Sequence, residues 1–367
     1  MKIRSIRFLK LGIFMIPAAA VLWAACTTEE KPAEPVKPIG AVVVIKAPLG
    51  LPAVPTPEDN PPTAETIALG RNLYYDPLLS VDDTIACASC HHPDFGFTDG
   101  KRFSAGVGGQ LGGRSAPTVI NSAYNDVQFW DGRSPSLEDQ AEGPVQNPIE
   151  MAHTLDGVVK KLTAHATYPA AFEKAYGPGA ITYEKVEKAI ATFERTVLSG
   201  NSPYDRFQFG GEKDAMSESA QRGLEVFRDP KKGNCAVCHS VGEKTSLFTD
   251  NKFHNIGVGV VQDETGAASL SDVGRFEVTQ VDADRGAFKT PTLRNISQTA
   301  PYMHDGSLGT LKEVVDFYVG GGNSNDQLDK EIKVLDYLTG RERQDLEEFL
   351  KSLTAELPAD VGPPEGM

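Results

Sequence analysis

The sequence has little cysteine, a deficit of positive charge and no apolar run suited to crossing a membrane. Four of its 5 cysteines fall in two short motifs, so no pair remains for a structural disulfide. The net charge of -14 argues against nucleic acid as a partner, because phosphates would be repelled by such a surface. The apolar run from Leu11 to Trp23 is short and contains Pro17, which disfavours a transmembrane anchor. Continuous strand patterns are scarce, so we predict a mainly α fold with long loops.

What the sequence does contain is two copies of Cys-x-x-Cys-His. This spacing attaches a c-type haem: the two thiols bond to the haem and the histidine ligates its iron. A zinc site or a dithiol redox pair is the alternative, but neither explains a histidine after each second cysteine. The sequence therefore predicts two covalent c-type haems, the first held by Cys87, Cys90 and His91 and the second by Cys235, Cys238 and His239.

The N-terminus has the composition of an export signal followed by a linker. Basic residues precede the apolar run, and Ala24-Ala25-Cys26 follows it. The small residues before Cys26 resemble a bacterial lipobox, which would make Cys26 a lipidated N-terminus; an ordinary cleaved signal is the alternative. Export is consistent with c-type haem, which bacteria attach outside the cytoplasm. We expect a signal over 1–25, a Pro-rich linker over 26–61, and a periplasmic protein tethered to the membrane as a lipoprotein.

A short repeat precedes each haem motif. Residues 70–77 and 223–230 both predict the end of a helix, then Asp-Pro, then a loop into the motif. Duplication of one haem domain is the simplest explanation. We therefore predict an N-terminal haem domain over 62–205, a C-terminal haem domain over 206–355 and a tail over 356–367. Helical periodicity over 186–197 and 335–353, and a capping box at Thr310 and Glu313, agree with this division.

Several longer motifs identify a family. Phe129-Trp130-Asp131-Gly132-Arg133 lies between the two haem motifs, and Pro291-Thr292-Leu293-Arg294-Asn295 and Pro301-Tyr302-Met303-His304-Asp305-Gly306 follow the second. With the haem motifs, this order resembles the bacterial di-haem cytochrome c peroxidases and the related methylamine-utilisation enzyme MauG. The resemblance covers about residues 62 to 355. It implies two cytochrome c-like haem domains, mainly α, with long loops and little strand.

The resemblance also implies roles for individual residues. It makes the first haem the peroxidatic one and the second the electron-transfer one, with Trp130 as a relay between them. It places Glu150 and Gln140 above the first iron, where a carboxylate can move a proton between the peroxide oxygens, provided that burial raises its pKa. From the residues alone, Glu150 would be a surface charge and Trp130 a core aromatic.

Two positions depart from the peroxidases. Many of them carry a distal histidine in the loop that corresponds to residues 104–110, but this loop contains none. We therefore expect the first iron to be five-coordinate or water-bound at rest, with no reductive activation step. The methionine that ligates the second haem is replaced by Tyr318, as in MauG, and a phenolate favours ferric and higher oxidation states. A packing role for Tyr318 and ligation by Met303 are the alternatives.

The family also binds calcium between its domains. Thr299 and Pro301 match the positions of its carbonyl ligands, but the position of its side-chain amide holds Ser115, a weaker oxygen donor for a hard cation. The resemblance therefore leaves open whether one calcium ion binds at these three residues.

Taken with the resemblance, these features predict a di-haem c-type peroxidase that reduces hydrogen peroxide to water. Its electrons would come from a small periplasmic cytochrome c or cupredoxin. The alternative is a MauG-like oxidase that uses a high-valent di-haem state to modify Trp or Tyr on a partner protein; Tyr318 and the open first haem favour it. A passive electron-transfer cytochrome is a third hypothesis, but a carrier needs no residues such as Glu150 and Gln140 at a substrate position. A homodimer, common among the peroxidases, is a further alternative.

Overall fold

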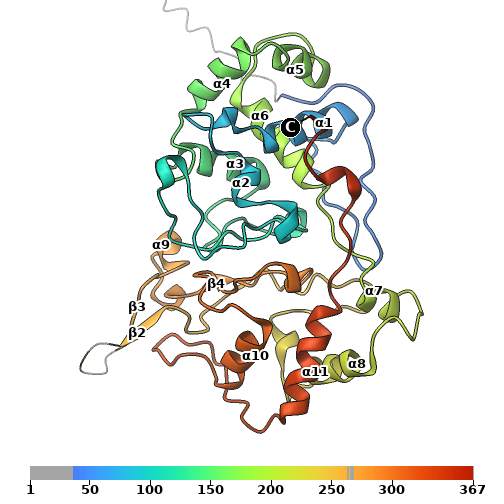
Figure 1. Cartoon of the computed structure of the whole chain (residues 1–367), viewed down its shortest axis with the longest axis vertical. Helices are drawn as coiled ribbons and strands as arrows, with labels where there is room; N and C mark the ends of the chain where they lie inside the picture. Colours follow the sequence, from blue (N-terminus) through green and yellow to red (C-terminus); the bar gives the residue numbers. More distant parts are fainter. Residues whose placement is uncertain (1–35, 263, 265–267, 367) are drawn as a thin grey trace, which may run out of the picture. The chain divides into compact units, whose positions relative to one another are not determined.

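The structure is a computed structural model that describes residues 36–262, 264 and 268–366 (Figure 1). The predicted export signal, Cys26 and the first ten residues of the predicted linker lie outside the described residues. Within the described part, no helix is both long and apolar enough to span a bilayer.

Helices and loops make up most of the described chain, with only four short strands (Figure 1). Strand β1 (Phe253–His254) pairs with β4 (Phe288–Lys289), and β2 (Val260–Gln262) pairs with β3 (Ala268–Leu270), both antiparallel. The prediction of a mainly α fold with little strand is confirmed. The helices are α1 Ala64–Tyr75, α2 Cys87–Cys90, α3 Leu137–Gln146, α4 Leu155–Ala164, α5 Tyr168–Tyr176, α6 Tyr183–Glu194, α7 Pro203–Gln208, α8 Glu218–Arg228, α9 Phe276–Thr279, α10 Leu311–Val319 and α11 Gly340–Lys351.

Short 3-10 helices interrupt the long loops. They are η1 Pro77–Leu79, η2 Pro93–Phe95, η3 Val107–Gly109, η4 Ser122–Tyr124, η5 Cys235–Val237, η6 Asp282–Asp284, η7 Ile296–Gln298 and η8 Ala359–Val361. The longer helices mostly begin at a Ser or Thr whose hydroxyl accepts a hydrogen bond from the backbone N–H three residues on, as at Ser136 before α3 and Thr182 before α6. The capping box predicted at Thr310 and Glu313 is present and fixes the start of α10.

The same helix crossing occurs twice. A Cβ at Gly70 of α1 would lie 1.9 Å from the carbonyl oxygen of Ala189 and 2.9 Å from Phe193 on α6. A Cβ at Gly223 of α8 would lie 1.9 Å from the carbonyl oxygen of Asp345 and 2.8 Å from Phe349 on α11. Only glycine allows each pair of backbones to approach this closely. The repeat seen in the sequence is therefore repeated in three dimensions.

Each crossing lies in its own hydrophobic cluster. The first cluster comprises residues from Leu69 to Val197 together with Val361, and includes the fully buried Leu73, Tyr74 and Phe193. The second runs from Tyr204 to Leu353 and includes the fully buried Phe227 and Phe349. The predicted boundary between residues 205 and 206 falls inside α7, and the division into two domains stays a prediction.

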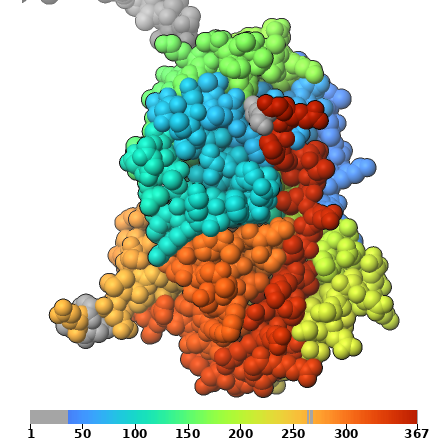
Figure 2. Space-filling model, in the orientation of Figure 1, coloured from blue at the N-terminus to red at the C-terminus, as the bar shows by residue number. Residues whose placement is uncertain are grey.

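The segments at both ends of the described chain pack against these clusters. Val36 contacts the first cluster, and its carbonyl oxygen accepts a hydrogen bond from Lys188 at 2.8 Å. Gly50 is buried, and its carbonyl oxygen accepts a 3.0 Å hydrogen bond from the buried Arg294. From residue 36 onward, the predicted linker is thus held along the body. The tail, red in Figure 2, lies against the blue N-terminal part of the described chain. Tyr75 of α1 donates a 2.7 Å hydrogen bond to the carbonyl oxygen of Val361 in this tail.

Candidate functional site

The first haem motif forms a single helical turn, α2, that ends at His91. His91 is anchored from two sides: Tyr74 donates a 2.8 Å hydrogen bond to its carbonyl oxygen, and its Nδ1 lies 3.2 Å from the carbonyl oxygen of Phe97. Because a carbonyl can only accept, Nδ1 carries the proton and Nε2 keeps its lone pair. Burial also lowers the pKa of His91, which favours the neutral ring. The imidazole is thus prepared to ligate a metal through Nε2.

The second motif holds its histidine in the same way. Nδ1 of His239 lies 3.0 Å from the carbonyl oxygen of Phe248, and burial lowers the pKa of His239. Phe97 and Phe248 are both fully buried, with φ of 59° and 55°. A bulky residue rarely adopts a positive φ, and here the unusual backbone turns each carbonyl toward the histidine. The two motifs therefore present equivalent ligands.

A cavity of about 320 Å³ surrounds the second motif. Both cysteines and His239 face it, and its other walls are largely apolar. Burial raises the pKa of the Cys235 thiol. Two thiols and an imidazole with a free Nε2 around an enclosed apolar space are what a covalently attached haem needs, so the residues fit the group. The apolar wall includes Leu311, Val315, Leu346 and Leu350.

Both predicted alternatives for the sixth ligand of the second haem line this cavity. Tyr318 comes from α10, and Met303 comes from the loop before it, at a φ of 71°. Burial, together with the nearby Cys235 and Cys238, raises the pKa of Tyr318, so the free side chain is a neutral phenol. A bound ferric ion would have to supply the charge that makes it a phenolate.

Trp130 lies where elements of the two halves meet. Its Nε1 donates a 2.8 Å hydrogen bond to the carbonyl oxygen of Ser115, and its own carbonyl oxygen accepts one of 2.8 Å from Lys289 on β4. Its ring centroid lies 6.5 Å from that of His304, at an interplanar angle of 70°. Trp130 lines the second-haem cavity together with Thr98, which follows the first motif. This position is compatible with a relay between the motifs.

Glu150 lies against the loop that lacks a distal histidine. Its carboxylate accepts a 2.7 Å hydrogen bond from Asn147, and its carbonyl oxygen accepts one of 2.8 Å from Val107 in that loop. Gly106 lies so close that a Cβ there would be 2.6 Å from the Glu150 Cα. Burial raises the pKa of Glu150, while the Asn147 bond and the charge of Arg133 oppose the rise. Gln140 is half-buried on α3; in the described part of the chain its side chain is not hydrogen-bonded to Glu150.

The three residues considered for calcium lie along the same cavity. Ser115, Thr299 and Pro301 all line it. The Ser115 hydroxyl lies 3.4 Å from the carbonyl oxygen of Lys101, and the Ser115 carbonyl oxygen already accepts the Trp130 hydrogen bond. Each of these residues offers at least one oxygen, and none of their side chains carries a negative charge.

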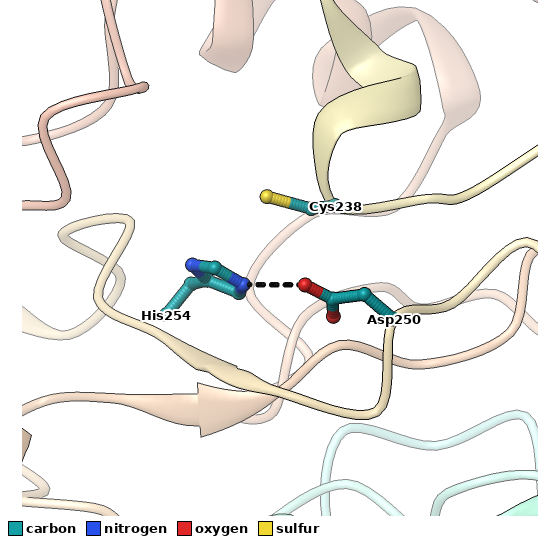
Figure 3. Close-up of side chains that lie close together, drawn as sticks. All are labelled: Cys238, Asp250 and His254. Atoms are coloured by element: carbon teal, nitrogen blue, oxygen red, sulfur yellow. Dashed lines mark hydrogen bonds and ion pairs between the residues drawn. The ribbon is translucent and has the colours of Figure 1, made fainter.

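A second cluster that resembles a metal site has another explanation. Ligand atoms of Cys238, Asp250 and His254 lie within 4.8 Å of one another (Figure 3). His254 lies between two carboxylates, with Nδ1 2.6 Å from Asp329 and Nε2 3.1 Å from Asp250. The Cys238 sulfur and these carboxylates raise the pKa of His254 to about 10. The predicted haem attachment would convert Cys238 into a thioether, and the cluster would then have no thiolate to offer a second metal.

Comparisons with known proteins identify a family. Residues 64–214 match the family described as di-haem cytochrome c peroxidase. The methylamine utilization protein MauG of Methylorubrum extorquens is 41% identical over 314 residues, which cover 85% of this chain and 84% of that protein. The cytochrome c551 peroxidase of Nitrosomonas europaea is 35% identical over 311 residues, 84% of each chain.

Solved structures of a MauG-like protein and of a diheme peroxidase are similar to this chain. A MauG-like protein associated with microbial copper homeostasis superposes with a TM-score of 0.76 at 33% identity, over 86% of this chain and 96% of that chain. The diheme peroxidase BthA from Burkholderia thailandensis gives a TM-score of 0.68 over 87% of this chain and 96% of its own. At 22% identity, that second likeness shows the fold alone.

Proposed function

The chain belongs to the family of di-haem cytochrome c peroxidases and MauG, and from this premise we propose that it is an oxidoreductase that reduces hydrogen peroxide to water. Its electrons come from a small cytochrome c or cupredoxin. The observation that carries the proposal is the contrast between the two motifs. Their histidines are held alike, yet Glu150 lies by the loop after the first motif and Tyr318 by the second.

The chain carries two c-type haems, which when bound supply the peroxide and electron-transfer chemistry. Cys87, Cys90 and His91 hold the first, and Cys235, Cys238 and His239 hold the second. The hydrogen bonds from the histidine Nδ1 atoms to Phe97 and Phe248 fix the tautomer that ligates iron and make each imidazole a stronger donor.

Glu150 is the residue that moves the proton. Its carboxylate takes a proton from one peroxide oxygen and returns it to the other as the O–O bond breaks. Burial helps, because it raises the pKa of the carboxyl and so makes the protonated form easier to reach during the transfer. Asn147 orients the carboxylate through its 2.7 Å hydrogen bond. Gln140, from α3, would bind the peroxide, and Trp130 would pass oxidising equivalents between the halves.

Tyr318 is the residue that closes the second site. Its place on the cavity wall, with the thioether positions nearby, supports ligation by its oxygen. A phenolate stabilises ferric iron over ferrous iron, because it donates negative charge. Met303 is the alternative ligand and would have the opposite effect on the potential.

A second function is favoured by Tyr318 and by the similarity to MauG. An oxidised state stored at both sites could remove electrons from a Trp or Tyr of a partner protein instead of accepting them from a small donor. Several of the relatives are named as cytochrome c peroxidases and two as MauG. The discriminating property is the rate at which a small reduced cytochrome restores the resting enzyme.

We further propose a periplasmic location, a lipid anchor at Cys26, two haem domains over 62–205 and 206–355, and a homodimer. We also propose that one calcium ion binds at Ser115, Thr299 and Pro301. The separate hydrophobic clusters support the two domains. The shared position of the three calcium candidates along one cavity supports that site, and the lack of a carboxylate among them predicts weak binding.

The role of Glu150 is tested by stopped-flow measurement of the reaction of peroxide with the oxidised Glu150→Gln variant. We expect the second-order rate constant to fall about 10²- to 10⁴-fold, the usual contribution of a positioned acid–base group. Asp139→Asn is the matched control, since Asp139 is exposed in the first turn of α3. A Glu150→Gln variant that reacts with peroxide as fast as the unaltered protein would contradict the assignment.

A further inference from the structure

Glu194 is a buried carboxyl that the proposed reaction does not use. It lies in the last turn of α6 with 5% of its surface exposed. Among the described residues, its side chain enters no hydrogen bond and no ion pair. An isolated carboxyl in such a place is costly, because burial disfavours its charged form. The next question is which group in the folded protein the buried carboxyl of Glu194 faces.

The repeated helix crossing identifies what Glu194 faces. Gly70 contacts Ala189 and Phe193 of α6 in the same way that Gly223 contacts Asp345 and Phe349 of α11. The two crossings therefore share one register, in which Ile190 corresponds to Leu346 and Glu194 corresponds to Leu350. Leu346 and Leu350 both line the second-haem cavity. By this equivalence, Ile190 and Glu194 form the corresponding wall at the first haem.

The surroundings of Glu194 agree with this placement. Its charge acts on the Cys87 thiol, to which the first haem is attached, and on Tyr74, which anchors His91; in both it adds to burial in raising the pKa. The remaining titratable groups that act on it are Arg195, which follows α6 directly, and Glu138 on α3.

Arg195 does not neutralise Glu194. Its guanidinium is bound at both ends by Glu138, with N–O distances of 2.8 and 3.0 Å. The charge of Glu138 therefore opposes that of Arg195 at Glu194, and burial still raises the pKa of Glu194. Cys87 becomes an uncharged thioether once haem is attached. Among the described residues, Glu194 is therefore a carboxyl on this wall without an ion-pair partner of its own.

We propose that Glu194 is a proton-binding group on the wall of the first haem, and that its protonation is coupled to reduction of that haem. When the ferric iron takes one electron from a donor, the Glu194 carboxylate takes one proton from solvent and becomes a carboxylic acid. Oxidation reverses both transfers. At the second haem, the position equivalent to Glu194 holds the apolar Leu350.

The direction of the effect follows from charge. Burial raises the pKa of Glu194 to about 8, so the carboxyl changes charge close to neutral pH. An ionised carboxylate on this wall would stabilise the ferric state of the haem, because opposite charges attract. The reduction equilibrium of the first haem should therefore shift toward ferric as pH rises, by at most about tenfold per pH unit, the limit for one proton per electron.

The test is a spectroscopic redox titration of both haems at several pH values, with no peroxide or protein donor present. It requires that the two haems be attached, but not that the protein be a peroxidase, so the two proposals can fail separately. We expect the first-haem potential to fall with rising pH in the unaltered protein and to depend much less on pH in Glu194→Gln and Glu194→Leu. The second haem and the surface control Glu173→Gln should behave as in the unaltered protein.

An equal pH dependence of the first-haem potential with and without Glu194 would overturn the proposal. If both variants fail to incorporate haem, redox-difference infrared spectroscopy of the unaltered protein tests the proposal instead. Reduction of the first haem should then produce the C=O stretch of a newly protonated carboxylic acid. The absence of that band, over the pH range in which the potential changes, would equally overturn it.

Discussion

At the scale of residues, the two haem sites differ in a few side chains around equivalent ligands. His91 and His239 each donate from Nδ1 to a buried phenylalanine carbonyl. The sequence predicted both histidines, because Cys-x-x-Cys-His is a strong local signal. It could not predict Phe97 and Phe248, since nothing about a phenylalanine indicates a positive φ. A single glutamate in a helix such as Glu194 gives the pattern of a solvated charge, and only the three-dimensional repeat shows which wall it faces.

Tyr318→Phe tests the proposed ligand of the second haem. Removing the phenolate oxygen should raise the potential of that haem, because the ferric state loses a negatively charged ligand. Potentiometry that resolves the two haems measures the change. Tyr176→Phe is the control, because Tyr176 is buried in the first hydrophobic cluster and does not line the second-haem cavity. An unchanged potential in Tyr318→Phe would indicate a packing role for this tyrosine or ligation by Met303.

At the scale of elements, two close helix crossings set the positions of the haem walls. The crossing of α1 with α6 and that of α8 with α11 both depend on a glycine. The sequence predicted α6 and α11 from helical periodicity over 186–197 and 335–353. The short repeat around Gly70 and Gly223 predicted the ends of α1 and α8 and indicated the duplication. It could not indicate how closely the backbones approach, because that distance depends on residues more than 100 positions away along the chain.

Gly70→Ala should destabilise the first crossing. The new methyl group would lie 1.9 Å from the Ala189 carbonyl oxygen, so the helices must separate. We expect a loss of ~1–3 kcal/mol in the free energy of unfolding, the usual cost of overpacking. Thermal or denaturant unfolding of the haem-loaded protein measures it. Gly340→Ala at the start of α11 is the control: nothing lies within 4 Å of its added Cβ, so it should leave stability unchanged or slightly improved.

At the scale of the whole molecule, the two end segments contribute contacts to the folded body that their composition does not predict. Residues 36–61 are rich in proline, which is typical of a linker. Hydrogen bonds from Lys188 and Arg294 nevertheless hold this segment against the body. The tail after α11 ends on α1, with Val361 fully enclosed in the first cluster. Composition cannot reveal such contacts, because the partner groups lie far away in the sequence.

Removal of residues 359–367 should therefore weaken the first cluster. The deletion exposes the pocket of Val361 and breaks the hydrogen bonds from Tyr75 and Arg71 to the tail. We expect a loss of ~2–4 kcal/mol in the free energy of unfolding, because one valine is no longer buried and three hydrogen bonds, one of them exposed, are broken. Unfolding monitored at the first haem should move to lower temperature. A truncated protein as stable as the full chain would show that the tail contacts contribute nothing.

The central claim is that the two haems are not equivalent: the first is open to peroxide and the second is closed by a side chain. Electron paramagnetic resonance of the fully oxidised protein tests this claim most directly. We predict one high-spin ferric haem and one low-spin ferric haem, with the high-spin signal lost on addition of peroxide and no prior reduction required. Two six-coordinate low-spin haems that do not respond to peroxide until the protein is partly reduced would contradict the claim.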